Sequence, residues 1–155
     1  MTHSKLFGLF AAFVLGAVVL SSCQQKQPEP EPETFMSDKE RPTWTAPEKY
    51  DYTASMTAVI RMDLKAQYPQ KAADFVVKDE DVFAAFSGDS CLGVAELKDG
   101  LYYLYVVGTE GAVTLRYYSA HYKNIFEAVN AFDFKNDTQL GTPGAPFIPQ
   151  WVEQK

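Results

Sequence analysis

The chain has 155 residues, a formal net charge of −6 and two cysteines. A chain of this length holds one domain besides any targeting segment, which excludes large multidomain enzymes. With 14 Lys and Arg against 20 Asp and Glu, the composition offers no basic surface for phosphates, so we expect no nucleic-acid partner.

The first residues have the pattern of a secretory signal. Lys5 precedes an uninterrupted apolar run of 15 residues, Leu6–Leu20. At about 1.5 Å per residue this run is too short for the roughly 30 Å hydrocarbon core of a bilayer. The sequence therefore predicts a signal peptide over residues 1–22 and no permanent membrane span.

A lipid attachment sequence follows directly as Leu20-Ser21-Ser22-Cys23. It resembles the bacterial lipobox, which implies cleavage before Cys23, a diacylglyceryl thioether on its sulfur and an acyl chain on its new amino group. Two or more chains anchor a protein stably, so the membrane is an expected partner through Cys23. The alternative is a soluble secretion signal with an incidental cysteine.

The resemblance also bears on location, because many lipoproteins with Asp after the cysteine stay at the inner membrane. Here the residue is Gln24, which favours the outer membrane. Whether the protein faces the periplasm or the cell surface stays open.

A polar segment separates Cys23 from the rest of the chain. Residues 24–43 have almost no apolar content and include the alternating Pro-Glu run Pro28–Glu33. Such a segment cannot bury a core, so we expect residues 23–43 to form a lipidated, disordered stalk. At about 3.1 Å per residue it could hold a domain up to about 60 Å from the bilayer.

The remaining residues, 44–155, have the pattern of short β-strands. Apolar residues alternate along several runs, and Asp99-Gly100 is a strong hairpin signal because both residues tolerate positive φ. This pattern predicts an all-β domain, an antiparallel β-sandwich of immunoglobulin-like or carbohydrate-binding-module-like type. The predicted strands are Ser55–Met62, Val82–Phe86, Cys91–Leu97, Leu101–Val107, Ala112–Ser119 and Ala131–Phe134.

Two segments depart from this pattern. Apolar residues recur at helical spacing over 122–129, which allows one short helix between the last strands. The three prolines of the tail Gly141–Gln150 exclude a central strand. We expect the tail to run along the surface, pinned by Phe147, Ile148 and Trp151.

Several residues together form a recognisable signature, D-x-x-x-A-F-x-G-x-x-C-x-G-x-A, which begins at Asp81 and ends at Ala95. It resembles the signature of small β-sandwich modules in lipoproteins and surface proteins of Gram-negative bacteria. The resemblance implies a β-sandwich at the cell envelope and adds little about activity. A structural interpretation is also open, because Gly88 permits a tight turn, Gly93 suits a bulge and a buried Cys91 acts as a small hydrophobe.

Catalytic and metal-binding residues are scarce. His121 is the only histidine after the signal peptide, which excludes zinc sites built from several imidazoles. A Cys91–His121 nucleophile pair is conceivable, but a thiol among apolar strand residues is inert. The acidic stretches Asp79–Asp81 and Asp133–Asp137 lack the spacing of a calcium loop, although calcium stays an alternative. We therefore predict no cofactor, no metal site and no enzyme activity.

Tyrosines are the remaining candidates. Tyr103 and Tyr105 fall on one face of their predicted strand, so some rings should be exposed and able to stack on sugars or dock on proteins. The alternative is that tyrosine serves only strand propensity and cross-strand pairing. The candidate binding residues are Trp44, Tyr102, Tyr103, Tyr118 and Tyr122.

These observations favour a membrane-anchored, non-catalytic lipoprotein that binds a glycan or a partner protein at the cell envelope. A structural or assembly subunit of an envelope complex is the alternative, and a hydrolase is the weakest hypothesis.

Overall fold

The computed structural model describes residues 34–48, 52–108 and 110–154. The predicted signal peptide, Cys23 and the Pro-Glu run lie outside these ranges. None of the helices within them is long and apolar enough to cross a membrane.

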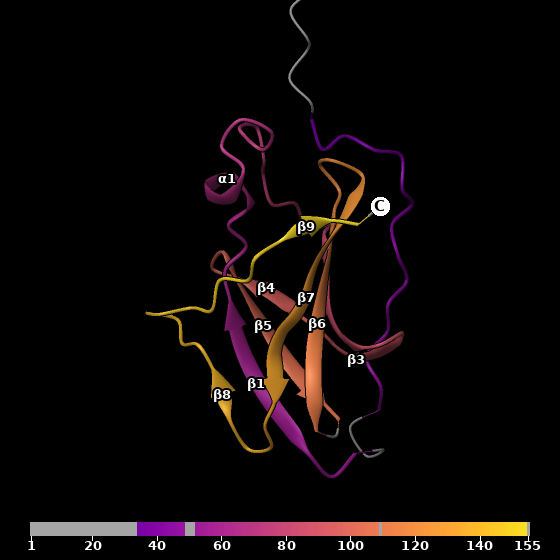
Figure 1. Cartoon of the computed structure of the whole chain (residues 1–155), viewed down its shortest axis with the longest axis vertical. Helices are drawn as coiled ribbons and strands as arrows, with labels where there is room; N and C mark the ends of the chain where they lie inside the picture. Colours follow the sequence, from indigo (N-terminus) through magenta and orange to yellow (C-terminus); the bar gives the residue numbers. More distant parts are fainter. Residues whose placement is uncertain (1–33, 49–51, 109, 155) are drawn as a thin grey trace, which may run out of the picture. The chain divides into compact units, whose positions relative to one another are not determined.

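Strands dominate the described part of the chain and form two sheets (Figure 1). Sheet A has the order β4 (Glu96–Lys98), β5 (Leu101–Val107), β1 (Ser55–Ile60) and β8 (Gln139–Leu140). Sheet B has the order β3 (Ser90–Val94), β2 (Val82–Ser87), β6 (Gly111–Ser119), β7 (Asn124–Phe134) and β9 (Val152–Glu153). The pairings are antiparallel except for β1 with β8, so the predicted all-β sandwich is confirmed with one parallel pair.

The core lies between the inner faces of the two sheets. Because side chains alternate along a strand, each strand sends every second residue inward. The buried inward residues include Ala58 and Ile60 of β1, Phe83 and Ala85 of β2, Tyr102, Leu104 and Val106 of β5, Leu115 and Tyr117 of β6, and Phe126 of β7.

Two predicted hairpins are present. Asp99 and Gly100 join β4 to β5 with φ of 52° and 75°, the left-handed conformation that tight two-residue turns require. Gly88, with φ of 59°, lies in the turn from β2 to β3.

The predicted strand Cys91–Leu97 divides between the sheets. Its first part is β3, which pairs with β2 in sheet B, and after Ala95 it continues as β4, which pairs with β5 in sheet A. Ala95 still donates to the carbonyl of Phe83 at 2.8 Å. This corner closes one side of the sandwich.

The short helix suggested for residues 122–129 is wrong. These residues belong to the turn before β7 and to β7 itself, which is a single strand that also contains the predicted Ala131–Phe134. Its register with β6 shifts between Val113 and Leu115, and Asn130 there has φ of 50°. The helical spacing arose because β7 carries apolar residues on both faces: Phe126 is buried in the core, whereas Ile125 is half-buried on the other face and Val129 is exposed.

A short helix occurs elsewhere. The connection from β1 to β2 contains α1 (Leu64–Gln67), whose N-cap Asp63 accepts a hydrogen bond from Ala66 N at 3.3 Å. Leu64 is buried in the core together with Phe75 from the same connection. This connection therefore closes one end of the sandwich.

The N-terminal segment, residues 34–48, is not the disordered stalk that we expected for residues up to 43. Phe35 is 3% exposed and packs at 5.1 Å from Tyr68 and 5.0 Å from Phe126, between ring centroids. Ser37 N donates to the carbonyl of Tyr122 at 2.8 Å. The folded domain therefore begins before residue 44, and a compact unit extends from Glu31 to Lys155.

This segment then covers the outer face of sheet B, as its path in Figure 1 indicates. The hydroxyl of Tyr118 donates to the carbonyl of Lys39 at 3.4 Å, and the Trp44 ring packs edge-on against Phe86 at 5.3 Å. Ala84, which lies on the same outer face, is also buried. The segment thus gives sheet B a second buried face.

The C-terminal tail follows the predicted course in part. Trp151 is buried in the core, and Phe147 packs against the core and pairs with Ile60. Trp151 N donates to Gln67 Oε1 at 2.9 Å. Ile148 is exposed, so it does not pin the tail.

Candidate functional site

Three of the five candidate aromatic residues are buried and cannot form an exposed platform. Tyr102 points into the core, where its ring lies 4.9 Å from that of Phe83. Tyr118 lies beneath the N-terminal segment, on the outer face of sheet B. Tyr122 is fully buried, so the expectation that these three rings are available to a ligand is wrong.

Tyr122 lies in a polar cluster at one end of the sandwich. Its hydroxyl donates to Asp74 Oδ1 at 2.7 Å, and His121 Nε2 lies 3.1 Å from Asp74 Oδ2. The hydrogen bond from Tyr122, followed by that from His121, lowers the pKa of the Asp74 carboxyl. Burial raises the pKa of Tyr122 above its ordinary value. Through these hydrogen bonds the cluster links residues 61–81, the connection from β1 to β2, to the turn between β6 and β7.

The other two candidates, Trp44 and Tyr103, are half-buried. Trp44 holds the N-terminal segment on sheet B through its contact with Phe86. Tyr103 lies on the outer face of sheet A, where its register partners are Val59 in β1 and Glu96 in β4. Of the five, Tyr103 is therefore the candidate best placed to meet a ligand.

Tyr103 lines a groove of about 550 Å³ on the outer face of sheet A. Tyr105 follows on the same face of β5 and is exposed, as the alternation of the strand predicted. Tyr105 is not among the five candidate residues, although its two-residue spacing from Tyr103 places both rings on one face. The two rings are the aromatic surfaces of the groove.

The groove combines apolar side chains with a few polar ones. Its apolar lining includes Val94 of β3, and Glu96, Thr57 and Gln139 supply oxygen and amide groups. Pro47 of the N-terminal segment also lines it. An apolar concave surface with a small number of polar groups is the usual composition of a binding site.

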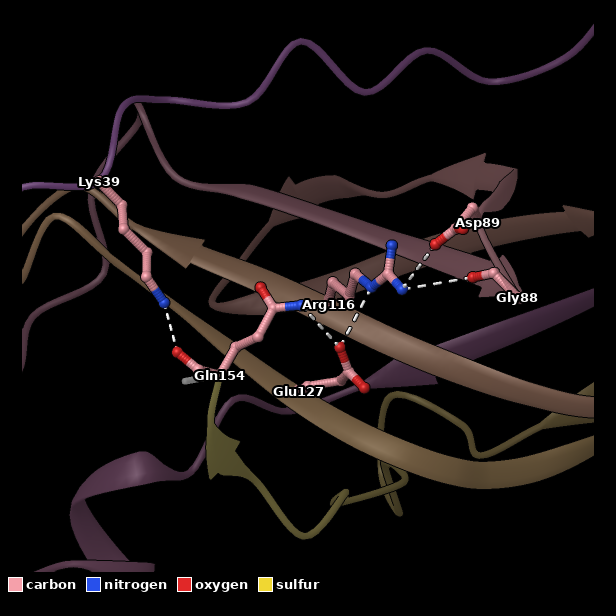
Figure 2. Close-up of polar contacts among 6 residues, drawn as sticks. All are labelled: Lys39, Gly88, Asp89, Arg116, Glu127 and Gln154. Carbon is pink, nitrogen blue, oxygen red and sulfur yellow. Dashed lines mark hydrogen bonds and ion pairs between the residues drawn. The ribbon is translucent and has the colours of Figure 1, made fainter.

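The outer face of sheet B carries a polar network centred on Arg116 (Figure 2). Arg116 Nε lies 3.2 Å from Glu127 Oε2, and its Nη2 lies 3.6 Å from Asp89 Oδ1 and donates to the carbonyl of Gly88 at 3.3 Å. The guanidinium stacks over the Phe86 ring at 4.3 Å. Because two carboxylates and a ring face this cation, its role is structural.

The same network includes residues from the N-terminal and C-terminal segments of the described chain. Gln154 Nε2 donates to Glu127 Oε2 at 3.1 Å, and Lys39 Nζ donates to the carbonyl of Gln154. Figure 2 shows these side chains arranged in one row across the strands. The row joins the N-terminal segment, sheet B and the C-terminal strand.

The suggested Cys91–His121 pair does not form. Cys91 is opposite Phe86, which pairs with Thr114, whereas His121 lies beyond the opposite end of β6. At about 3.3 Å per residue, the two side chains are roughly 15 Å apart or more. Burial raises the pKa of the Cys91 thiol, which disfavours the reactive thiolate.

The acidic stretches have structural partners. Asp81 accepts hydrogen bonds from Lys78 N at 2.9 Å and Ala120 N at 2.7 Å. Asn136 Oδ1 accepts from Ser55 N at 2.8 Å, and Asn136 Nδ2 donates to Asp137 at 3.0 Å. Within the described ranges, no three His, Cys, Asp or Glu side chains are grouped to hold a metal ion.

Comparisons of the chain with protein-family models, with curated proteins and with solved structures find no match. The geometry of the sheet A groove is therefore the basis for a functional interpretation.

Proposed function

We propose that this protein is a lipid-anchored, non-catalytic binding protein of the cell envelope, and that the groove on sheet A binds a neutral glycan. The observation that carries the proposal is the pair of tyrosines, Tyr103 and Tyr105, on one face of β5 in a groove of about 550 Å³.

Sugar rings present an apolar face of C–H groups and an edge of hydroxyls. Tyrosine rings suit the apolar face, because they combine a flat surface with a polar tip. Glu96, Gln139 and Thr57 can exchange hydrogen bonds with the hydroxyls. The carboxylate of Glu96 and the net charge of −6 disfavour anionic polysaccharides, which points to uncharged sugars.

The compact unit of residues 31–155 provides the protein for a binding test. Affinity electrophoresis or a glycan array would compare neutral polysaccharides with uronic-acid polymers. We expect retention by a neutral polysaccharide and a loss of about fivefold or more in affinity for Tyr103→Ala, since a stacked ring contributes about 1 kcal/mol or more.

Tyr52→Ala is the matched control, because Tyr52 is an exposed tyrosine that does not line the groove. It should bind like the unsubstituted protein. If the protein retains no polysaccharide, or if Tyr103→Ala binds normally, the glycan proposal is rejected.

The lipid anchor rests on the Leu20–Cys23 sequence and has its own test. Cells expressing the full chain should incorporate radiolabelled palmitate into the protein, and Cys23→Ala should abolish the label. Separation of inner and outer membranes would then test the expected outer-membrane location. An unlabelled, soluble secreted protein would reject the anchor.

A role as an assembly subunit is the second candidate, and the edge of β7 beyond β9 favours it, where the tail residues 147–150 lie near residues 128–131 but form no strand with them. In the part of the chain that the structure describes, β9 pairs only with Phe126 and Glu127, so residues 128–134 of β7 have no strand on that side. Val129 on this edge is 59% exposed. Crosslinking in cells from a probe at Val129 should capture one recurrent envelope protein if this role is correct, and no neighbour if it is not.

A further inference from the structure

Three exposed apolar side chains belong to two segments at the end of the sandwich where the described chain begins. Met36 is 57% exposed, Val76 is 49% exposed and Val77 is 40% exposed. Their buried neighbours Phe35 and Phe75 flank one ring, because both lie within 6.0 Å of the Tyr122 ring centroid. We name Met36, Val76 and Val77 the apolar tip.

The path of the chain fixes the end of the domain at which the described residues begin. Burial of Phe35 and the hydrogen bonds from Ser37 N and Lys39 N to the turn after β6 hold the N-terminal segment at this end. Figure 1 shows the segment starting at the same end of the domain as α1 and the β6–β7 turn. Ten residues therefore connect Cys23 to the first described residue, Thr34.

This tether is short compared with the stalk expected from the sequence. Eleven residue steps from Cys23 to Thr34 reach at most about 40 Å when fully extended. Packing of residues 34–43 on the domain removes about half of the expected stalk. The residue at which the described chain begins therefore stays within about 40 Å of any membrane in which Cys23 is anchored.

The charges around the tip are mixed. Lys71 Nζ lies 4.6 Å over the Phe35 ring, and Lys123 follows Tyr122 in the chain. Asp38 and Asp74 are the acidic residues close in sequence to the tip residues. Contact with a membrane at this end would therefore be made by apolar side chains and would need no anionic lipid.

We propose that the apolar tip rests on the lipid bilayer in which the protein is anchored. This inference rests on the proposed lipid at Cys23. The anchor supplies the affinity, and the three side chains set the orientation by entering the headgroup region. The opposite end, around Lys135, then points away from the bilayer, because β7 alone spans 11 residues, about 35 Å.

The test uses the lipid-modified full chain in vesicles of phosphatidylethanolamine with nitroxide-labelled headgroups. An environment-sensitive fluorophore is placed at Val76→Cys or at the exposed control site Lys135→Cys, each with Cys91→Ser so that one thiol reacts. We expect the label at residue 76 to be quenched several-fold more than the label at residue 135. Equal quenching at both sites overturns the proposal.

A second measurement avoids the cysteine changes. Hydrogen exchange of the unsubstituted lipidated chain should slow at residues 75–78 on vesicles relative to detergent, and should not change at residues 135–138. Unchanged exchange at both segments overturns the tip contact while the anchor stands. A chain that carries no lipid and does not sediment with vesicles overturns the anchor itself.

Discussion

Gly93 in β3 and Tyr105 in β5 are in direct backbone contact across the corner where the chain passes from sheet B to sheet A. A Cβ at Gly93 would stand 2.1 Å from the carbonyl oxygen of Tyr105. The corner that closes the sandwich, and the position of Tyr105 in the groove, therefore depend on a residue without a side chain.

The first prediction is that Gly93→Ala lowers the free energy of unfolding by about 3 kcal/mol or more, because rigid backbone cannot move to admit the methyl group. Denaturant unfolding would measure it. Gly88→Ala is the control: its Cβ would meet nothing within 4 Å, so only its φ of 59° costs stability, about 1 kcal/mol. Equal losses for the two variants would contradict the corner contact.

The second prediction concerns the N-terminal segment. A chain that starts at Trp44 should be less stable than one that starts at Glu31 by about 3 kcal/mol or more, because it loses the buried ring of Phe35 and uncovers Tyr118. Urea unfolding of the two chains would decide this. Within the longer chain, Phe35→Ala should cost about 3 kcal/mol, whereas Met36→Ala should change stability by less than about 0.5 kcal/mol. If the two chains were equally stable, the N-terminal segment would contribute nothing to the folded domain, as expected for a stalk.

The third prediction concerns Asp81, which accepts hydrogen bonds from Tyr117 Oη and from two backbone amides. Asp81→Ala should destabilise the protein by about 3 kcal/mol, because the buried Tyr117 hydroxyl and Ala120 N–H lose their acceptor. Tyr117→Phe alone should cost about 1 kcal/mol. In a double-mutant cycle the two losses should be less than additive, and strict additivity would show that the bond contributes nothing.

The fourth prediction concerns alkaline pH. Burial is the main cause of the raised pKa values of Tyr102, Tyr117 and Tyr122. In the unfolded chain these groups ionise near pH 10, so the unfolded state releases protons first. The stability that they contribute is complete below about pH 10 and is lost as pH rises above it.

The absorbance of tyrosinate during an alkaline titration would test whether the three buried tyrosines ionise only on unfolding. Of the nine tyrosines, these three should ionise only in a cooperative step that coincides with loss of the β-sheet circular dichroism signal. Smooth ionisation of all nine with an unchanged circular dichroism spectrum would contradict their burial.

Local pattern predicted much of the fold. Alternation along Leu101–Val107 placed Tyr103 and Tyr105 on one face, and the turn chemistry of Asp99-Gly100 and Gly88 predicted two hairpins that the structure contains. These predictions succeed because strand faces and tight turns depend on neighbouring residues. The conformation of β7 depends on its pairing with other strands, and there the local pattern wrongly predicted a short helix.

The sequence by itself determined the strand content and the tight turns, since each follows from residue type and spacing. Only the tertiary structure decided which tyrosines are buried, and that residues 34–48 pack on sheet B. Both depend on contacts between residues far apart in the chain. A polar segment with two aromatic residues is indistinguishable from a stalk until Phe35 and Trp44 have surfaces to pack against.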